Sequence, residues 1–453
     1  MPDAPVPAEL IARYDVPAPR YTSYPTVPAW TAPFGPADYR AALAELAEAE
    51  GESLALYVHI PFCEYRCHYC ACNVTLARRG EVADHYLERL ERELDLVTEV
   101  LGRQRRPQEL HLGGGTPNFL TVEQSNRLAG MLERRFALGT EVERSIEADP
   151  RLVSREQLAG LRVLGFRRIS FGVQDFDPVV QAAIGRVEPE AVVHQAVELA
   201  RETGFEGVNL DLVYGLPSQT PARFERTLRE TLALRPDRIA CYNYAHVPTL
   251  RHNQRLIDAG SLPSRDEKFQ LFRMAVDAFT GHGYQWIGLD HFAREDDELA
   301  RAAREGRLRR DFMGYTTRET GHLLGFGMSA IGDVAGRFVQ NVPRTGQYQR
   351  ELDRGELPVE RGHRLSDDDK GRRQAILRLM CQLDLPYHML PAPADESAGR
   401  LRPLVDDGLV AESGESYQVT PMGRWFLRNI ALALDAYLPR QTAGDRPVFS
   451  RAI

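Results

Sequence analysis

The sequence predicts an α/β protein built around a parallel β-sheet. From Leu54 onward, short apolar runs typical of strands alternate with longer amphipathic runs typical of helices. Six such pairs follow one another, and right-handed connections between them would form a curved sheet or part of a barrel. Periodicity alone leaves a full eight-stranded barrel and a partial barrel both open.

Each of the six units consists of a strand-like run followed by a helical run. The strand-like runs are rich in Val, Ile, Leu, Phe and Tyr, and the helical runs repeat apolar residues every three or four positions. In order, the pairs are LALYVHI with 82–101, ELHLG with 122–136, RSIEAD with 154–164, RRISFGV with 189–203, GVNLDLVYG with 221–234, and DRIACYNYA with 265–282.

The chain continues on both sides of this alternation. The first fifty residues are rich in Pro and Ala and contain one predicted helix, over 36–49. After about Thr317 the alternation stops. The segment 318–365 includes the glycine-rich run GFGMSAIG, and we expect it to connect two larger regions and to pack near the functional site.

The C-terminal region is predicted to be mostly helical. Ser366 is a favourable N-cap for a helix that reaches Leu383, and three aspartates follow it in the first turn, where the helix dipole favours acids. The run LRPLVDDGLVAESGESYQVTPMGRWFLRNIALAL then resembles a winged helix, with a wing that turns at 413–415. We therefore predict four regions: an N-terminal extension 1–50, a partial or full barrel 51–317, a connecting segment 318–365 and a C-terminal domain 366–453.

Composition restricts the possible functions. The 453 residues are 43% hydrophobic and 26% charged, which is ordinary for globular proteins. The net charge of -8 argues against a nucleic-acid partner, so the winged element is expected to act as a lid or packing domain. No apolar run approaches the ~20 residues of a membrane span, and the N-terminus has no apolar h-region. We expect a cytoplasmic protein without a membrane segment or signal peptide.

Four cysteines crowd into ten residues of the run CEYRCHYCAC. Cys63, Cys67 and Cys70 have the spacing C-x3-C-x2-C, which can place three thiolates on three corners of an iron–sulfur cube and leave the fourth iron open. A four-thiolate zinc site is the main alternative, but only one residue separates Cys70 from Cys72. Disulfide frameworks belong to short secreted chains. The isolated Cys241 and Cys381 are expected to be buried small hydrophobes.

Glycines and polar residues cluster at the predicted carboxyl ends of the strands, where parallel α/β proteins bind ligands. The glycine run at 113–115 lets the backbone approach a ligand closely, although a tight turn explains it equally well. Glu147 and Asp211 can anchor an ammonium group or a ribose hydroxyl, with a helix cap or salt bridge as the alternative. Gln174 can bond either polarity, and Arg186 can bind a carboxylate or lie at the surface.

Together these motifs resemble the radical S-adenosylmethionine (SAM) superfamily and, within it, the family of oxygen-independent coproporphyrinogen III oxidases. The resemblance extends from about Arg20 to the C-terminal run FSRAI. The motifs that carry it are YVHIPFCEYRCHYCACN, RYTSYPT, LHLGGGTPNFL, SIEADPR, FGVQDF, LDLVYGLPSQT, YNYAHVPT and GLDHFAR.

The resemblance implies a fold and a set of binding residues. It favours a partial (β/α)6 barrel, open on one side to a large substrate, and a [4Fe–4S] cluster on Cys63, Cys67 and Cys70 with Cys72 outside it. It implies that Tyr57, Gly114, Glu147 and Ile331 contact the SAM on the cluster. A second set matches positions that contact a second SAM molecule, or else mark the place of the substrate: Tyr69, Gly115, Thr116, Gln174, Arg186, Asp211 and Ala245.

The implied activity is anaerobic oxidative decarboxylation in heme biosynthesis. A radical generated from SAM would take a hydrogen atom from each of two propionates of coproporphyrinogen III, and loss of CO2 would leave the vinyl groups of protoporphyrinogen IX. The implied partners are the porphyrinogen and an electron donor such as a flavodoxin or ferredoxin, with a monomeric protein. The alternatives are a heme chaperone and a radical enzyme that opens or methylates heme. Heme chaperones generally lack the fourth cysteine and RYTSYPT, which are both present here.

Overall fold

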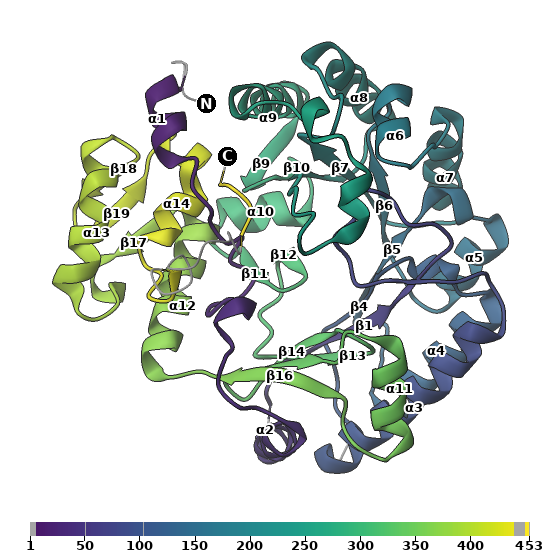
Figure 1. The fold of residues 1–453 in the computed structure, drawn as a ribbon. Helices are drawn as coiled ribbons and strands as arrows, with labels where there is room; N and C mark the ends of the chain where they lie inside the picture. The colour runs from purple at the N-terminus through teal and green to yellow at the C-terminus, as the bar shows by residue number, and fades with distance from the viewer. Residues whose placement is uncertain (1–5, 50, 103, 439–448, 453) are drawn as a thin grey trace.

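A single twelve-stranded sheet forms the body of the protein in this computed structural model, which describes residues 6–49, 51–102, 104–438 and 449–452. The central strands run in parallel and in chain order, and the sheet curves into an open barrel (Figure 1). The predicted partial α/β barrel is therefore confirmed. Its six predicted strands are β1 (Leu54–Ile60), β4 (Glu109–Gly114), β5 (Glu143–Ala148), β6 (Arg168–Gln174), β7 (Gly207–Tyr214) and β8 (Arg238–Asn243).

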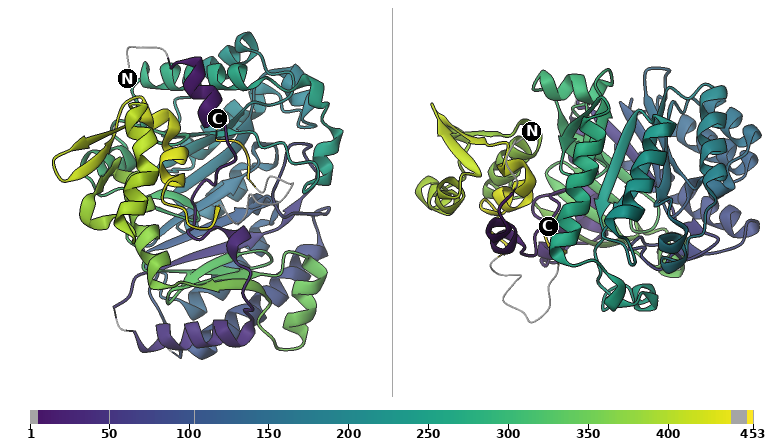
Figure 2. Two further views of the ribbon diagram at one scale, coloured as in Figure 1. Left: turned by 60° about the vertical axis from the view of Figure 1, so that its left-hand side comes forward. Right: turned by 90° about the horizontal axis from the view of Figure 1, so that it is seen from above.

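Six long helices follow these strands and cover the outside of the barrel, as Figures 1 and 2 show. All six were predicted to within two residues at each end. Several begin at side-chain caps such as Thr121, Ser154 and Ser264, which accept backbone N–H groups of the first turn. The helices are α3 (Glu81–Leu101), α4 (Val122–Arg135), α5 (Arg155–Val163), α7 (Glu190–Glu202), α8 (Pro221–Leu234) and α9 (Arg265–Thr280).

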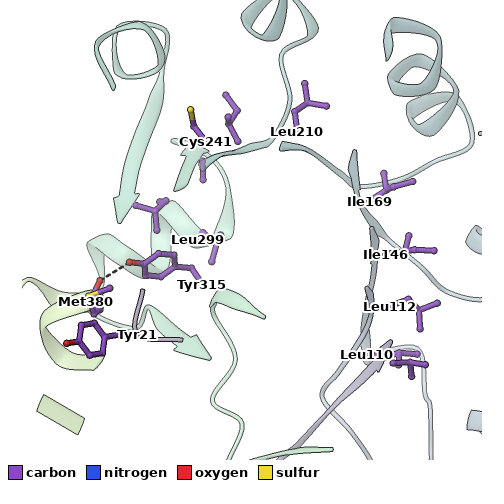
Figure 3. Packing of buried hydrophobic residues seen from close by; sticks show 14 of the residues in the cluster. Tyr21, Leu110, Leu112, Ile146, Ile169, Leu210, Cys241, Leu299, Tyr315 and Met380 are labelled. Carbon is purple, nitrogen blue, oxygen red and sulfur yellow. Dashed lines mark hydrogen bonds between the residues drawn. The ribbon is translucent and has the colours of Figure 1, made fainter. Parts of the chain in front are cut away.

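Residue alternation along the strands separates the core from the barrel interior. Apolar residues on one face pack under the helices; Figure 3 shows five of them, Leu110, Leu112, Ile146, Ile169 and Leu210. Side chains on the opposite face point into the barrel and are mostly polar. They include His111, Glu147, Ser170, Asn209 and Asp211, which line an interior cavity of about 190 Å³. The period of two thus gives a dry outer layer and a polar interior.

The segment 318–365 does more than connect two regions. It adds four strands to the barrel sheet, which the sequence pattern does not predict because glycines interrupt its apolar runs. The first pairs in parallel with β1, and the others continue antiparallel. A further hairpin, β9 (Tyr284–Gly288) and β10 (His291–Arg294), closes the opposite edge. The added strands are β13 (His322–Phe326), β14 (Ile331–Val334), β15 (Arg337–Asn341) and β16 (Val359–Arg364).

The C-terminal region agrees with the prediction. Helix α12 (Asp367–Gln382) begins in a capping box between Ser366 and Asp369. Helix α13 (Ala394–Asp406) precedes a two-stranded wing, β18 (Val410–Ser413) and β19 (Ser416–Val419), which β17 (Asp384–Pro386) extends to three strands. Helix α14 (Leu427–Leu432) follows the wing. Residues 439–448 and 453 of the predicted domain lie outside the described residues.

The N-terminal extension runs between the barrel and the C-terminal region (Figure 1). Helix α1 (Ala8–Tyr14) contacts the C-terminal region, where Asn429 donates to the carbonyl of Tyr14. Arg20 pairs with Asp290 at the barrel. Helix α2 (Pro36–Glu48) was predicted, whereas residues 1–5 and 50 lie outside the described residues. Among the described residues, no helix is long and apolar enough to cross a bilayer. The division into four regions remains a prediction.

Candidate active site

A cavity of about 860 Å³ lies at the carboxyl ends of the barrel strands. The loop after β1 and the ends of β4, β5, β6 and β7 contribute to its wall. Eleven of the fourteen residues predicted for the site line this cavity: Cys63, Cys67, Tyr69, Cys70, Gly114, Gly115, Thr116, Glu147, Gln174, Arg186 and Asp211. The fold therefore brings together residues that are spread over 149 positions of the sequence, from 63 to 211.

The three predicted cluster ligands are unbridged thiols in different surroundings. Cys63 lies 3.3 Å from the hydroxyl oxygen of Thr116, and burial raises the pKa of its thiol to about 11. Burial also raises the pKa of Cys67. The pKa of Cys70 is lowered, chiefly because the Cys72 side chain donates a hydrogen bond to it. Iron binding would therefore displace protons from Cys63 and Cys67.

The spacing of the sulfur atoms bears on the zinc alternative. Within the described ranges, no three cysteine sulfurs all lie within 4.8 Å of one another, the closeness that ligands of a single ion have. An iron–sulfur cube carries its thiolates on separate corner irons, so the thiolate sulfurs lie farther apart than they do around a single ion. A single-ion site on three of these thiols would therefore require them to move closer together.

The glycine run at the end of β4 is required by close approach to its neighbours. A Cβ on Gly115 would lie 2.7 Å from the carbonyl oxygen of Pro61, and one on Gly114 would lie 2.8 Å from the His59 ring. Gly114 also has φ 124°, which side chains other than glycine rarely adopt. The glycines thus let β4 lie directly beside the loop that carries the cysteines, while leaving backbone on the cavity wall.

Glu147 is held at the cavity wall by two partners. Its Oε2 accepts the backbone N–H of Gly114 at 3.0 Å, and its Oε1 lies 3.5 Å from Nε2 of His111. Burial alone would raise the pKa of Glu147, but His111 and the Gly114 N–H outweigh it and hold that pKa below its ordinary value. Glu147 lies inside the fold, but 44% of its side-chain surface is open to the cavity, so an ionised carboxylate faces that cavity.

Asp211 occupies a contrasting environment on β7. Ser170 donates to one of its oxygens at 3.0 Å, and Asn209 donates to the other at 2.9 Å. Burial and the nearby charge of Glu147 raise the pKa of Asp211 to about 7. The two acids therefore differ in charge near neutral pH, one ionised and the other partly protonated.

Arg186 is buried in a network of ionic contacts. Its guanidinium lies 3.2 Å from Asp149 and 3.2 Å from Glu188, and it donates to the carbonyl of Gly172. The side chain is 8% exposed, so the surface position that the sequence allowed is wrong. Burial would raise the pKa of Asp149, but the charge of Arg186 and the bonds from Arg151 keep it lowered.

Three predicted residues do not line the cavity. Tyr57 lies behind the glycine run, stacked on His111, and its hydroxyl pairs with His59 at 3.0 Å. Ile331 lies on β14 and packs against a small apolar cluster of Trp30, Phe338 and Leu365. Ala245 follows β8, and its carbonyl accepts a hydrogen bond from Gln254.

Sequence reasoning missed several residues that support the site. His111, Asp149 and Ser170 orient predicted residues, and a period-two pattern of polar residues in the strands was the signal for the first and third. Asn253 and Gln254 hold the backbone of the cysteine loop. They lie in a short irregular segment with no motif, so nothing in the sequence pointed to them.

The donor set fits the cofactors that the resemblance implies. Three thiols line one cavity together with a glycine-rich backbone and an ionised carboxylate. Soft thiolates suit an iron–sulfur cluster, and a carboxylate beside exposed backbone groups suits an ammonium or ribose group. At about 860 Å³ the cavity is within the range of sites for sizeable small molecules.

The chain is similar to known proteins over nearly its whole length. The profile of the Radical SAM superfamily matches residues 57–231, and that of the HemN C-terminal domain matches 365–426. The oxygen-independent coproporphyrinogen III oxidase of Synechocystis sp. is 41% identical over 98% of both chains, and that of Escherichia coli is 42% identical over 98% of both. The solved structure of the coproporphyrinogen III oxidase (HemN) from Escherichia coli, a radical SAM enzyme, is similar to this one with a TM-score of 0.88 and 40% sequence identity. The match covers 96% of this chain and 99% of the Escherichia coli chain.

Proposed function

The chain belongs to the oxygen-independent coproporphyrinogen III oxidases of the radical SAM superfamily, and on that basis we propose how its residues divide the work. It is an oxidoreductase of heme biosynthesis that converts two propionate side chains of coproporphyrinogen III to vinyl groups. A heme chaperone or heme-modifying enzyme is not favoured, since the match to the oxidases extends over 98% of the chain.

We propose that Cys63, Cys67 and Cys70 hold a [4Fe–4S] cluster and that Cys72 remains outside it. When bound, the cluster and SAM supply a carbon-centred radical that removes a hydrogen atom from the substrate. The observation that carries this proposal is the convergence of all three thiols on one cavity with eight other predicted residues. Thr116 beside Cys63 and Arg186 beside Cys67 would support the negative charge of the thiolates.

We further propose that Glu147 and the backbone of Gly114 orient the SAM on the cluster. The ionised carboxylate of Glu147 can accept hydrogen bonds from a ribose or an ammonium group, and the N–H of Gly114 already fixes its orientation. Tyr57 on β1 and Ile331 on β14 would contact the same SAM. The two residues lie on either side of β13, because Tyr57 is in register with Gly325 of β13 and Gly325 packs on the backbone of Ile331.

A second ligand would bind in the same cavity. Arg186 and Asp211 offer a cation and a partly protonated carboxyl group on its wall, and Gln174, with φ 71°, adds an amide. These groups suit the carboxylate, ammonium and hydroxyl groups of a second SAM. The guanidinium of Arg186 would also suit a propionate of the substrate. Tyr69, Gly115, Thr116 and Ala245 complete this proposed set.

The regions outside the barrel would complete the enclosure. We propose that 1–50, 51–317, 318–365 and 366–453 form an extension, a catalytic region, a connecting segment and a C-terminal domain. Arg20 of the extension lies 5.2 Å over the ring of Tyr242, which lines the cavity. The extension would thereby help to exclude water and oxygen. We also propose a monomeric cytoplasmic enzyme that receives electrons from a flavodoxin or ferredoxin.

Turnover with identified products tests the function. The protein would be reconstituted anaerobically with iron and sulfide and supplied with SAM, a reductant, an electron acceptor and coproporphyrinogen III. Mass analysis of the oxidised porphyrins should show two successive losses of CO2, each with two hydrogens. Cleavage of SAM with an unchanged porphyrin would contradict the substrate assignment, and tight heme binding without vinyl products would favour a chaperone.

A further inference from the structure

A short helical turn after β8 contacts the cysteine loop from outside the cavity. This turn, η4 (His252–Leu256), carries the adjacent side chains Asn253 and Gln254. Neither residue lines the cavity, and Gln254 is fully buried.

Asn253 binds three carbonyl groups of the cysteine loop with one nitrogen. Its Nδ2 lies 3.0 Å from the carbonyl oxygen of Cys67, 3.0 Å from that of His68 and 2.9 Å from that of Cys70. Its Oδ1 accepts from Arg66 at 3.2 Å, which fixes the orientation of the amide. The two amide hydrogens are therefore shared among three acceptors of a single turn.

Gln254 binds the carbonyl that Asn253 does not reach. Its Nε2 donates to Tyr69 at 2.8 Å and to the carbonyl of Ala245 at 3.1 Å, while its Oε1 accepts the backbone N–H of Val247. One buried amide thus joins the cysteine loop to the end of β8. Tyr69 and Ala245 both belong to the proposed second ligand site.

All four consecutive carbonyls of residues 67–70 consequently accept hydrogen bonds from one dipeptide. The loop has little other backbone support in the described structure: His68 donates to Ile184, and Cys70 donates to the carbonyl of Cys67. The carbonyls of this turn bind η4, whereas Cys67 and Cys70 line the cavity.

We propose that Asn253 and Gln254 are positioning residues that hold the 67–70 turn in the conformation required to bind the cluster. The inference rests on the proposed cluster ligands and adds the groups that fix their backbone. Outer partners that orient metal ligands typically change metal affinity about ten- to a hundredfold when they are removed. The loss should therefore appear as faster iron release rather than as general unfolding.

The test compares iron release from reconstituted holoenzymes. Asn253→Asp keeps the size and the acceptor for Arg66 but places an oxygen against three carbonyls, and Asn253→Ala removes the amide without that repulsion. Leu256→Ala is the matched control, because Leu256 lies in the same turn and is 67% exposed. With an iron chelator present, both Asn253 variants should lose iron at least about tenfold faster than wild type, and the control should not.

The melting temperature of each apoprotein separates positioning from folding. The melting temperature of apo-Asn253→Ala should be close to the melting temperatures of the wild-type and Leu256→Ala apoproteins. Gln254→Leu should also release iron faster and should raise the KM for SAM, since it frees Tyr69 and Ala245 together. Equal iron release by wild type and both Asn253 variants would overturn this inference while leaving the cluster in place. A wild type that takes up no iron would overturn the proposed function, and this inference with it.

Discussion

Nη1 of Arg186 lies 3.8 Å from the sulfur of Cys67. The same guanidinium lies 3.2 Å from Asp149, so one buried cation joins a proposed cluster ligand to the carboxyl end of β5. Arg186 also faces the cavity. The proposed cluster site and the proposed second ligand site are therefore one continuous structure, and a change at this residue should affect both.

Replacement of Arg186 by methionine should destabilise the fold. Asp149 and Glu188, which are 8% and 1% exposed, would lose their buried cation and keep only Arg151, which is 24% exposed. Breaking a buried pair outright costs about 3–5 kcal/mol of unfolding free energy, and the remaining Arg151 should keep the loss near the lower end of that range. Urea unfolding of the apoprotein measures this loss of unfolding free energy. Arg155→Met is the control, because the Arg155–Glu202 pair is 62% and 55% exposed and should contribute less than about 1 kcal/mol. Equal losses in the two variants would contradict the network.

Glu147→Gln should weaken SAM binding while leaving the fold intact. The change removes an ionised acceptor from the cavity wall, and a hydrogen bond to a charged group contributes about 1.5–3 kcal/mol. The dissociation constant for SAM, measured by anaerobic equilibrium dialysis on the reconstituted protein, should rise about tenfold or more. Glu141→Gln, at a 48% exposed surface position, should leave it unchanged. Unaltered binding by Glu147→Gln would exclude the proposed contact.

Gly115→Ala should disturb the cysteine loop. The new methyl carbon would lie 2.7 Å from the Pro61 carbonyl oxygen and 2.8 Å from that of Phe62, and neither backbone group can move without shifting β1 or the loop. We expect a lower melting temperature and reduced iron uptake. Gly371→Ala, in α12 with nothing within 4 Å of the added carbon, should instead raise stability by up to about 1 kcal/mol. A normal iron content in Gly115→Ala would contradict the close approach.

Glu93 should make stability fall as pH rises. This fully buried acid on α3 accepts from Gly327, Asn341 and Tyr348, and burial raises its pKa from 4.5 to about 7. Between these values the unfolded chain releases a proton that the folded protein keeps. The contribution of Glu93 is thus present below pH 4.5 and is lost through about pH 7, a change of about 3 kcal/mol.

The difference between Glu93→Gln and wild type isolates that contribution. The melting temperature of the glutamine variant should decline less between pH 4.5 and pH 7 than that of wild type. Glu88→Gln on the same helix, at a 47% exposed position, should follow wild type throughout. Parallel curves for wild type and Glu93→Gln would show that Glu93 does not titrate in this range.

The predictable parts of this structure are those with a regular local signal. Alternating strand and helix periods predicted the six units, and capping residues such as Ser366 predicted where helices begin. The strands of 318–365 were missed because positions such as Gly325 and Gly332 interrupt their apolar pattern, and those glycines are needed where β13 and β14 lie close together. Their pairing with β1 is a tertiary contact that no local pattern records.

The residues of the site likewise fall into those that sequence motifs predict and those that they do not. Cys63, Gly114 and Glu147 belong to motifs and could be named from the sequence, and the fold brings them to one cavity. Asn253 and Gln254 could not be named, because their partners are backbone carbonyls about 185 residues earlier and their own segment has no periodicity. The burial of Arg186 likewise depends on Asp149 and Glu188, whose proximity to it appears only in three dimensions.

The most direct test is the iron and sulfide content of a set of cysteine variants after anaerobic reconstitution. Wild type and Cys72→Ser should each hold about four irons and four sulfides per chain. Cys63→Ser, Cys67→Ser and Cys70→Ser should each lose the cluster absorbance and the formation of vinyl product. Full iron content and turnover in Cys67→Ser, or loss of iron in Cys72→Ser alone, would contradict the three-cysteine site on which the account depends.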